Sequence, residues 1–339
     1  MAIATINKID IKNFFSISNI EIDNLKDKKE IYIVGENGDG KTLFLQSILV
    51  GLAGIKKGEV FELYECNPHD NLLLLIEMDN NLIYSDFSIK AYLDILAYGA
   101  SRNNYCQLKE DITGYLTLFS GEYDLRSPTK WLQYLDYSEQ KENNNIITIA
   151  QAKKLLQRLL NSDIEIDISP NGVTFTEKGS KVSFDQLSAG YKGVITIICD
   201  LIARLSEKQQ VENISDFQGV VLIDEVELHL HPKWQYSFIQ KLRTTFPLIQ
   251  FIVTTHSPTV LLGAGMEAVY YQIYKEEGVV KISEQRDIKN DFLNDIQSDI
   301  FGFDVNDERI NNPSEDDKKR QKRAKEAMLS LIDTIEKGE

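Results

Sequence analysis

The segment GENGDGKT, residues 35–42, places three glycines, a lysine and a hydroxyl directly after the apolar run EIYIV. It matches G-x-x-x-x-G-K-[ST], in which glycines let the backbone curl so that successive N–H groups point at phosphate oxygens. The lysine of this pattern reaches the β- and γ-phosphates, and the hydroxyl binds Mg²⁺. A chance glycine-rich turn is the alternative, but the strand-to-helix setting argues against it. The sequence therefore predicts a triphosphate-binding loop formed by Gly35, Glu36, Asn37, Gly38, Asp39, Gly40, Lys41 and Thr42.

An acidic pair ends the apolar run GVVLIDE. Asp224 is suited to hold Mg²⁺ together with Thr42, and Glu225 is suited to polarise an attacking water as a general base. An ordinary surface loop after a strand would carry the same residues. The phosphate-binding loop elsewhere in the chain favours the metal and general-base interpretation.

Three of the four histidines follow apolar strand-like runs. His256 ends IQFIVTTH, and ligands of an open α/β sheet collect at the carboxyl ends of its strands. We therefore assign His256 to the γ-phosphate and the attacking water. His229 and His231 have the spacing of metal ligands, but the sequence supplies no third or fourth partner, so loop packing or a dimer contact is expected.

The segment QLSAGYKG stands before a predicted helix over 189–206. Ser188, Ala189 and Gly190 would form an anion-binding surface at the start of this helix. A simple helix cap would use the same residues.

The elements that must position these groups alternate between short apolar strands and helices, which indicates an α/β core. Further strands are predicted in LLLLIEM, in AYLDILAY and in a strand–turn–strand series from 164 to 184. The remaining predicted elements are strands at 6–12, 17–22 and 31–34, and helices at 128–137, 148–161, 291–300 and 315–336.

Composition narrows the class of protein. The net charge of −15 argues against a protein that coats DNA. The three cysteines are far apart in sequence, which excludes a disulfide framework and fits a cytoplasmic protein. The first residues lack the pattern of a signal peptide, and no apolar run is long enough to span a bilayer, so no membrane contact is expected.

The four motifs, in this order, resemble those of ATP-binding-cassette (ABC) ATPases, and specifically the RecF/SMC/OLD-like branch. LSAGYKG looks like the signature motif, DEVELHLHP like the Walker B motif plus D-loop, and TTHSP like the switch histidine. KIDIKNFFSISNIEI looks like the N-terminal strand pair. Three departures stand out: Phe15 replaces a common arginine, Val226 replaces a proline, and ILAYGASR occupies the place of the Q-loop without its glutamine.

The resemblance implies an α/β fold: an ABC-type P-loop ATPase head with a mixed sheet and flanking helices. Its core would comprise residues 1–60 and 180–290, with an α+β insertion at 61–179 and a helical tail at 291–339. The sequence lacks the heptads of SMC arms. The segment between the glycine-rich loop and LSAGYKG is longer than in transporter ATPases, and the chain lacks their well-formed Q-loop.

The resemblance also implies a mechanism that uses ATP and Mg²⁺. Two copies would meet head to tail as a homodimer or within a higher oligomer. Lys41, Asp224 and Glu225 of one chain would hold each ATP, and Ser188 and Gly190 of the other would cover it. ATP would join the copies and hydrolysis would release them.

What this switch controls is a separate question. The chain resembles the ATPase halves of anti-phage systems, for instance Septu-like or PARIS-like pairs, whose partner is a nuclease or toxin effector. A RecF-like ATPase of DNA repair or chromosome maintenance is the alternative, and a non-cycling ATP-binding module is a third. The basic run KKRQKRAK, residues 318–325, is a candidate contact for nucleic acid or a solvated helix face.

Overall fold

The computed structural model describes residues 5–54, 72–78, 83–85, 94–102, 109–141, 146–160, 164–169, 172–177 and 179–287. The expected helical tail at 291–339 and the basic run at 318–325 lie outside the described residues.

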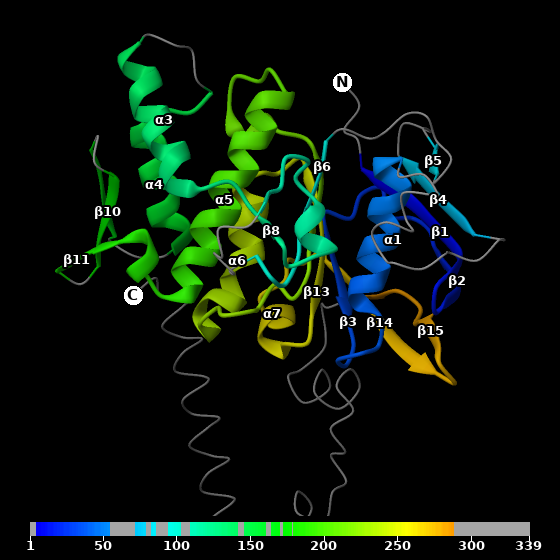
Figure 1. Cartoon of the computed structure of the whole chain (residues 1–339). Coiled ribbons are helices and arrows are strands. Elements are labelled where there is room, and N and C mark those ends of the chain that lie inside the picture. Colours follow the sequence, from blue (N-terminus) through cyan, green and yellow to red (C-terminus); the bar gives the residue numbers. More distant parts are fainter. Residues whose placement is uncertain are drawn as a thin grey trace, which may run out of the picture.

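An 11-stranded mixed sheet forms the centre of the molecule (Figure 1). Its parallel part has the order β14, β3, β13, β12, β6, and these strands are Val269–Glu276, Glu30–Val34, Ile249–Thr255, Gly219–Ile223 and Ile95–Tyr98. The sheet continues from β14 into what we call the wing, with the order β15, β2, β1, β4, β5. The wing strands are Val279–Ile282, Ile17–Ile22, Ile6–Phe14, Leu73–Met78 and Ile83–Ser85. The short strand β16, Arg286–Asp287, pairs with β14.

The burial of the strands explains their sequence patterns. Every residue of β3, β12 and β13 is buried, as expected for strands covered on both faces, and β12 is a continuous apolar run. The wing strands β2 and β4 alternate between buried and more exposed positions, because one face of the wing packs on α1 (Lys41–Ala53). The mixed sheet with flanking helices confirms the predicted fold class.

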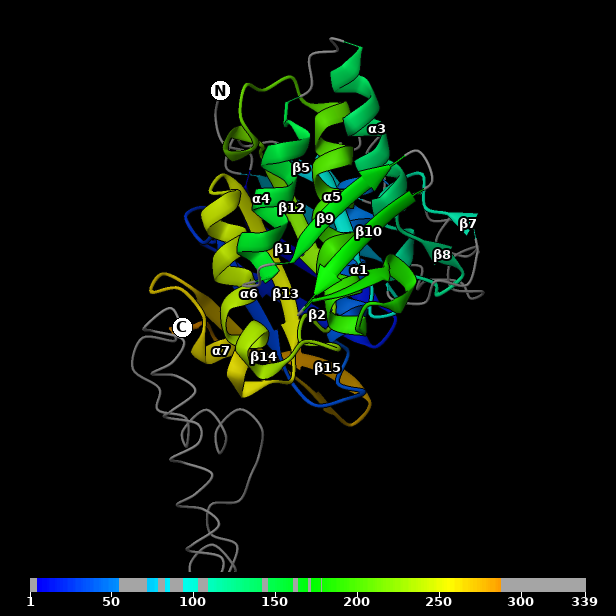
Figure 2. The same ribbon diagram turned by 90° about the vertical axis from the view of Figure 1, so that its left-hand side faces the viewer.

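Helices cover both faces of the sheet (Figures 1 and 2). Helix α1 and the wing share one apolar cluster on one face. A second cluster on the opposite face packs α5 and α6 on the sheet, with α3 and α4 outside them. These four helices are α3 Pro128–Gln140, α4 Ile149–Leu160, α5 Ala189–Lys208 and α6 Pro232–Thr245. The short helix α7, Pro258–Leu262, contacts α6.

Smaller elements complete the helical side. A three-stranded antiparallel sheet contains β9, β10 and β11, which span Glu165–Ser169, Gly172–Glu177 and Ser180–Ser183 and confirm the predicted strand series. A short parallel pair joins β7 (Lys109–Glu110) to β8 (Tyr123–Asp124). Three 3₁₀ turns, η1, η2 and η3, lie at Leu116–Leu118, Phe184–Gln186 and Ile214–Asp216.

The segment 61–179 contributes to the central sheet as well as to the helical layer. Within it, β4 pairs with β1 in the wing, and β6 pairs with β12 at the edge of the parallel part. The described helices include none whose length and apolar character would let it cross a bilayer.

Candidate nucleotide-binding site

The glycine-rich loop joins β3 to α1, and the helix begins at Lys41. The Lys41 side chain folds back over the loop, where its Nζ donates hydrogen bonds to the carbonyls of Gly35 (2.9 Å) and Glu36 (2.8 Å). It is only 6% exposed. The loop is closed on itself, because the N–H of Glu36 donates to the Asp39 carboxylate at 2.7 Å.

Gly40 cannot be replaced by a larger residue without strain. Its φ of 99° lies in the left-handed region, and a Cβ at this position would stand 2.7 Å from Cγ2 of Val280 on β15. The Val280 side chain of the wing therefore packs directly against the turn that starts α1.

A hydroxyl and a carboxylate meet beside the loop. Thr42 Oγ1 donates to Asp224 Oδ2 at 2.7 Å, and Thr254 Oγ1 donates to Asp224 Oδ1 at 2.6 Å. Both candidate metal ligands thus come together from α1 and from the end of β12. Hydroxyl and carboxylate oxygens are the donors that Mg²⁺ prefers, so this pair fits that ion.

Glu225 follows Asp224 in an unusual backbone conformation with a φ of 45°. Its N–H donates to Thr254 Oγ1 at 2.8 Å, and the N–H of Val226 donates to the Thr254 carbonyl at 3.1 Å. The candidate general base is therefore fixed against β13, the strand between β3 and β12.

His256 lies directly after β13 and is oriented by Glu227. One oxygen of Glu227 is 2.8 Å from His256 Nδ1 and also accepts the His256 backbone N–H at 2.6 Å. The His256 side chain is 46% exposed, whereas that of Glu227 is 5% exposed. The sequence interpretation did not assign Glu227. The second glutamate in DEVE was the available signal.

Arg102 is the second residue that the sequence interpretation missed. It follows β6, in the segment ILAYGASR. The sequence interpretation considered this segment only as a possible Q-loop and noted only its missing glutamine. Its guanidinium donates to the carbonyls of Asp224 (2.6 Å), Glu225 (2.8 Å) and Gly99 (3.0 Å). The arginine thus contacts the backbone of both acidic residues.

The signature-like residues lie at the start of α5. Ser188 and Ala189 are exposed, and Ser188 Oγ accepts the N–H of Tyr191 as a helix cap. Gly190 is buried, and a Cβ there would be 2.7 Å from the carbonyl oxygen of His229. In the described part of the chain, no hydrogen bond joins these three residues to the glycine-rich loop. By contrast, the carboxyl ends of β3, β12 and β13 bring together Lys41, Thr42, Asp224, Glu225 and His256.

His229 and His231 have packing roles in the structure. His231 caps α6, because its Nδ1 accepts the N–H of Lys233 at 3.3 Å. His229 adopts a φ of 63° and places its carbonyl against Gly190. This agrees with the expectation of loop packing.

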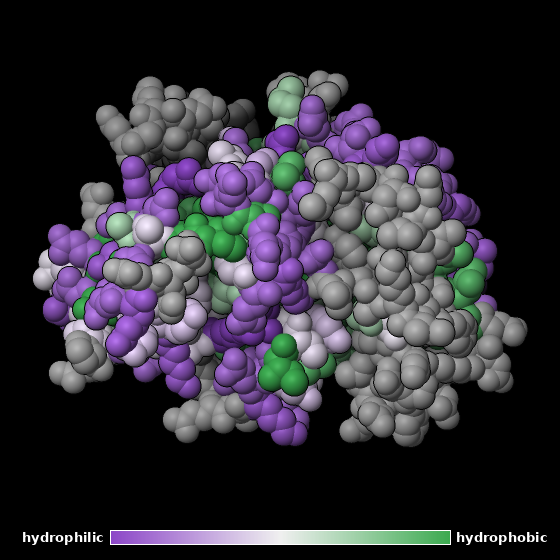
Figure 3. Space-filling model, turned by 90° about the horizontal axis from the view of Figure 1, so that it is seen from above, coloured by the Kyte–Doolittle hydropathy of each residue, from purple (hydrophilic) through white to green (hydrophobic). Residues whose placement is uncertain are grey.

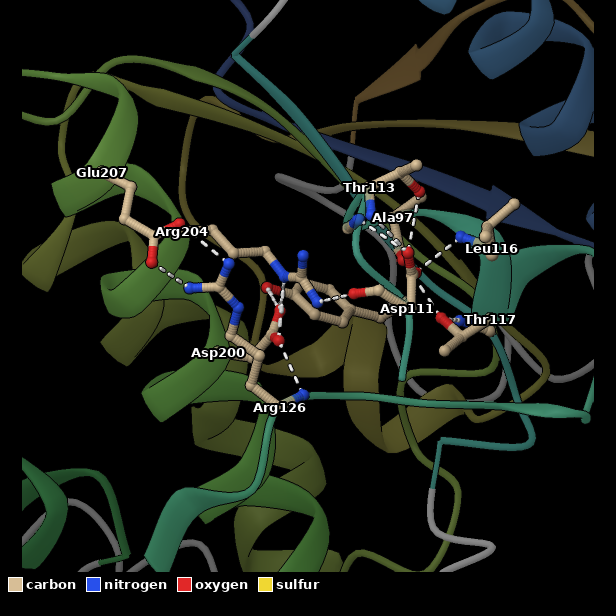
Figure 4. A network of polar contacts seen from close by, with 12 residues as sticks. Ala97, Asp111, Thr113, Leu116, Thr117, Arg126, Asp200, Arg204 and Glu207 are labelled. Atoms are coloured by element: carbon tan, nitrogen blue, oxygen red, sulfur yellow. Dashed lines mark hydrogen bonds and ion pairs between the residues drawn. The ribbon is translucent and has the colours of Figure 1, made fainter. Parts of the chain in front are cut away.

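A buried polar network joins β6 to α5 (Figure 4). Arg204 pairs with Asp200 at 2.8 Å with both side chains almost fully buried, and Asp200 also accepts from Tyr98 at 3.2 Å. Burial raises the pKa of the Tyr98 hydroxyl, and the nearby Asp200 carboxylate adds to the increase, so Tyr98 stays a hydrogen-bond donor. Arg204 also donates to the Asp111 carbonyl. The network holds the strand that precedes Arg102.

A separate pocket of about 410 Å³ lies between α3 and α5, with Trp131, Tyr134 and Glu207 among its lining residues. None of its lining residues belongs to the glycine-rich loop or to the acidic pair. In the view from above (Figure 3), hydrophilic residues predominate on the coloured part of the surface, and hydrophobic residues gather in small areas among them.

The glycine-rich loop joins a strand to a helix that begins at Lys41, and the acidic pair follows β12, the second strand along the sheet from β3. This arrangement resembles the P-loop fold of ABC ATPases. Comparison with known proteins confirms this resemblance. Residues 129–262 match the family described as "AAA domain, putative AbiEii toxin, Type IV TA system".

Two relatives come from bacteria. The chain is 29% identical to the Septu protein PtuA of Bacillus mycoides (strain KBAB4) over 381 aligned positions, which cover 98% of this chain and 51% of PtuA. It is 44% identical to the Retron Vc95 probable ATPase of Vibrio cholerae serotype O1 biovar El Tor over 108 residues, which cover 31% of this chain and 21% of that protein. The chain thus spans about half the length of this PtuA and less of the retron ATPase.

Among solved structures, the SMC head bound to the C-winged helix domain of ScpA aligns with a TM-score of 0.48 and 14% identity, over 83% of this chain and 97% of the SMC head.

Proposed function

We propose that this protein binds ATP with Mg²⁺ and hydrolyses it. The observation that supports the proposal most directly is the contact between Thr42 and Asp224 beside a loop closed by Lys41. These three side chains come from the two segments that bind the triphosphate and its metal in P-loop proteins. The family match and the retron relative, described as a probable ATPase, agree with it.

Each residue has a distinct role in the proposed reaction. Lys41 would exchange the carbonyls of Gly35 and Glu36 for phosphate oxygens. Thr42 and Asp224 would hold Mg²⁺, which neutralises charge that develops on the phosphates. Glu225 would accept a proton from the attacking water, and His256, held through Nδ1 by Glu227, would present its other ring nitrogen to the γ-phosphate.

Two substitutions test the ATPase proposal. Lys41→Ala should abolish ATP binding, measured with a fluorescent analogue, because the loop loses its cation. Glu225→Gln should keep binding within about threefold and slow hydrolysis about 100-fold or more, because only proton transfer is lost. Lys181→Ala, at an exposed lysine on β11 that is paired with Asp167, is the control and should match the native chain. Unchanged binding and turnover in Lys41→Ala would refute the proposal.

We further propose that ATP joins two copies, with Ser188 and Ala189 of one covering the nucleotide of the other. Both residues are exposed at a helix start, where backbone N–H groups attract an anion. When ATP is added, the molar mass of the Glu225→Gln variant, measured by light scattering, should double. The further substitution Ser188→Arg should return the mass to that of the monomer. If ATP leaves the mass unchanged, the sandwich arrangement is wrong.

The proposed role of this switch is to control an effector, a nuclease or toxin, in anti-phage defence. Similarity to a Septu protein and to a retron ATPase supports this role. Purification from native cells would test it: a stoichiometric nuclease- or toxin-like partner is expected, with release or activation dependent on ATP turnover. Turnover that is strongly stimulated by duplex DNA alone, with no protein partner, would instead support the DNA repair alternative.

A further inference from the structure

Arg102 stands at the end of β6, away from the motifs that carry the proposed chemistry, yet it reaches the backbone of both acidic residues. We propose that Arg102 is a positioning residue for hydrolysis: it fixes the backbone at Glu225 so that the carboxylate is aimed at the attacking water. This inference rests on the proposed ATPase function. In this proposal, Arg102 acts on the reaction through the backbone of Asp224 and Glu225.

The geometry gives the guanidinium a bridging role. Nη1 donates to the Asp224 carbonyl at 2.6 Å and Nη2 donates to the Glu225 carbonyl at 2.8 Å, while Nη1 also reaches the Gly99 carbonyl at 3.0 Å. Arg102 is 5% exposed, so these bonds form out of contact with water. A planar fork of donors can bridge two carbonyls in one fixed orientation, which a lysine cannot do.

These bonds complete the restraint of the two peptide groups that flank Glu225. Their N–H groups donate to Thr254: Glu225 N bonds the Thr254 hydroxyl at 2.8 Å, and Val226 N bonds the Thr254 carbonyl at 3.1 Å. Their carbonyl oxygens accept from Arg102. Strand β13 therefore holds one side of the turn and Arg102 holds the other.

The backbone at Glu225 needs this restraint. Its φ of 45° is uncommon for a residue with a side chain and persists only where the surroundings determine it. Relaxation toward an ordinary conformation would swing the carboxylate away from its present direction. A general base displaced by about 1 Å can lose about 100-fold in rate, so the arginine acts on the rate of the chemical step.

The backbone before Arg102 is itself held in place by hydrogen bonds. The N–H of Asp224 donates to the Tyr98 carbonyl at 2.8 Å, and Tyr98 bonds Asp200 on α5. The N–H of Gly99 donates to the Thr117 hydroxyl at 3.3 Å, and a Cβ at Gly99 would lie 1.9 Å from the Thr117 carbonyl oxygen. These contacts restrain the segment between β6 and Arg102.

The test combines Arg102→Met with Glu225→Gln. Arg102→Met should lower kcat about 100-fold while the dissociation constant for ATP stays within about threefold, since phosphate and metal ligands remain. In the Glu225→Gln background, the same change should lower the residual rate by no more than about threefold, because the base it aims is already absent. Arg102→Lys should remain slow, because it keeps the charge and loses the fork.

Arg158→Met is the control. Arg158 is an exposed arginine on α4 whose guanidinium donates to the Thr245 hydroxyl on α6, and its loss should leave kcat unchanged. If Arg102→Met fails to fold, judged by thermal unfolding, Arg102→Lys serves in the same double-variant experiment. Native turnover in Arg102→Lys, or equal losses with and without Glu225, overturns the inference. Equal turnover of the native chain and Glu225→Gln would instead refute the role of Glu225 in the proposed function.

Discussion

At the scale of single residues, Thr254 connects the two halves of the acidic pair. Its hydroxyl donates to the Asp224 carboxylate and accepts the N–H of Glu225, and the side chain is fully buried. One hydroxyl thus orients the candidate metal ligand and helps to hold the candidate base. Thr254 belongs to β13, which lies between β3 and β12, and this position makes both contacts possible.

Thr254→Val should weaken Mg²⁺-dependent turnover and destabilise the fold. Valine keeps the shape but leaves Asp224 Oδ1 and the Glu225 N–H without this partner, which costs about 1–3 kcal/mol in the free energy of unfolding. The measurements are urea unfolding and turnover as a function of Mg²⁺ concentration. Thr255→Val, on the opposite face of the same strand, is the control and should keep its Mg²⁺ dependence. An unchanged Mg²⁺ dependence in Thr254→Val would contradict this role.

The sequence predicts the residues that belong to short motifs at strand ends. The structure places Lys41, Thr42, Asp224 and His256 at one edge of the sheet, because parallel strands bring their carboxyl ends together. Their chemical roles stay predictions. Arg102 could not be found in this way, since its partners are backbone carbonyls that lie 122 and 123 positions away and carry no side-chain pattern.

At the scale of elements, the network in Figure 4 links the edge strand β6 to helix α5, which Ser188 caps. Asp200 and Arg204 lie one turn apart on α5, and Asp200 also accepts the N–H of Arg126 at 3.0 Å before α3. The sequence predicted α5 as a long helix but did not identify this pair, because an Asp and an Arg four residues apart are typical of an exposed face.

The effects of single substitutions within this pair on the free energy of unfolding should not be additive. Arg204→Met leaves a buried carboxylate, and Asp200→Asn leaves a buried guanidinium, so each should cost about 3–5 kcal/mol in the free energy of unfolding. Asp200→Asn with Arg204→Met together should cost less than the sum. Denaturant unfolding of the three variants measures this, and additive losses would show that the two side chains do not interact.

Helix α6 carries a lysine whose charge opposes folding. Burial lowers the pKa of Lys241 to about 8, and the neighbouring Lys233 and Arg158 contribute. The unfolded chain then binds more protons than the folded chain between pH 8 and the ordinary value of 10.5, so this group makes stability rise with pH across that range.

The substitution Lys241→Met removes this dependence. The free energy of unfolding of the variant minus that of the native chain should be highest below pH 8 and should decrease between pH 8 and 10.5. Urea unfolding at several pH values measures the difference. A difference that is flat or rises with pH would contradict the effect of burial on Lys241.

At the scale of the whole molecule, the sheet separates two apolar clusters. One contains α1 and the wing, and the other contains α3 to α6. The sequence indicated the individual strands and the α/β class. It could not give the strand order, because the placement of β6 beside β12 depends on contacts between segments more than 100 residues apart.

Strand β3 takes part in both clusters. Ile31 and Ile33 face the cluster of α1 and the wing, while Tyr32 and Val34 face the opposite cluster. The strand that leads into Gly35 is thus shared by both layers. Neither layer keeps its full apolar contact surface once this strand is lost, so packing on each face of the sheet contributes to the position of the glycine-rich loop.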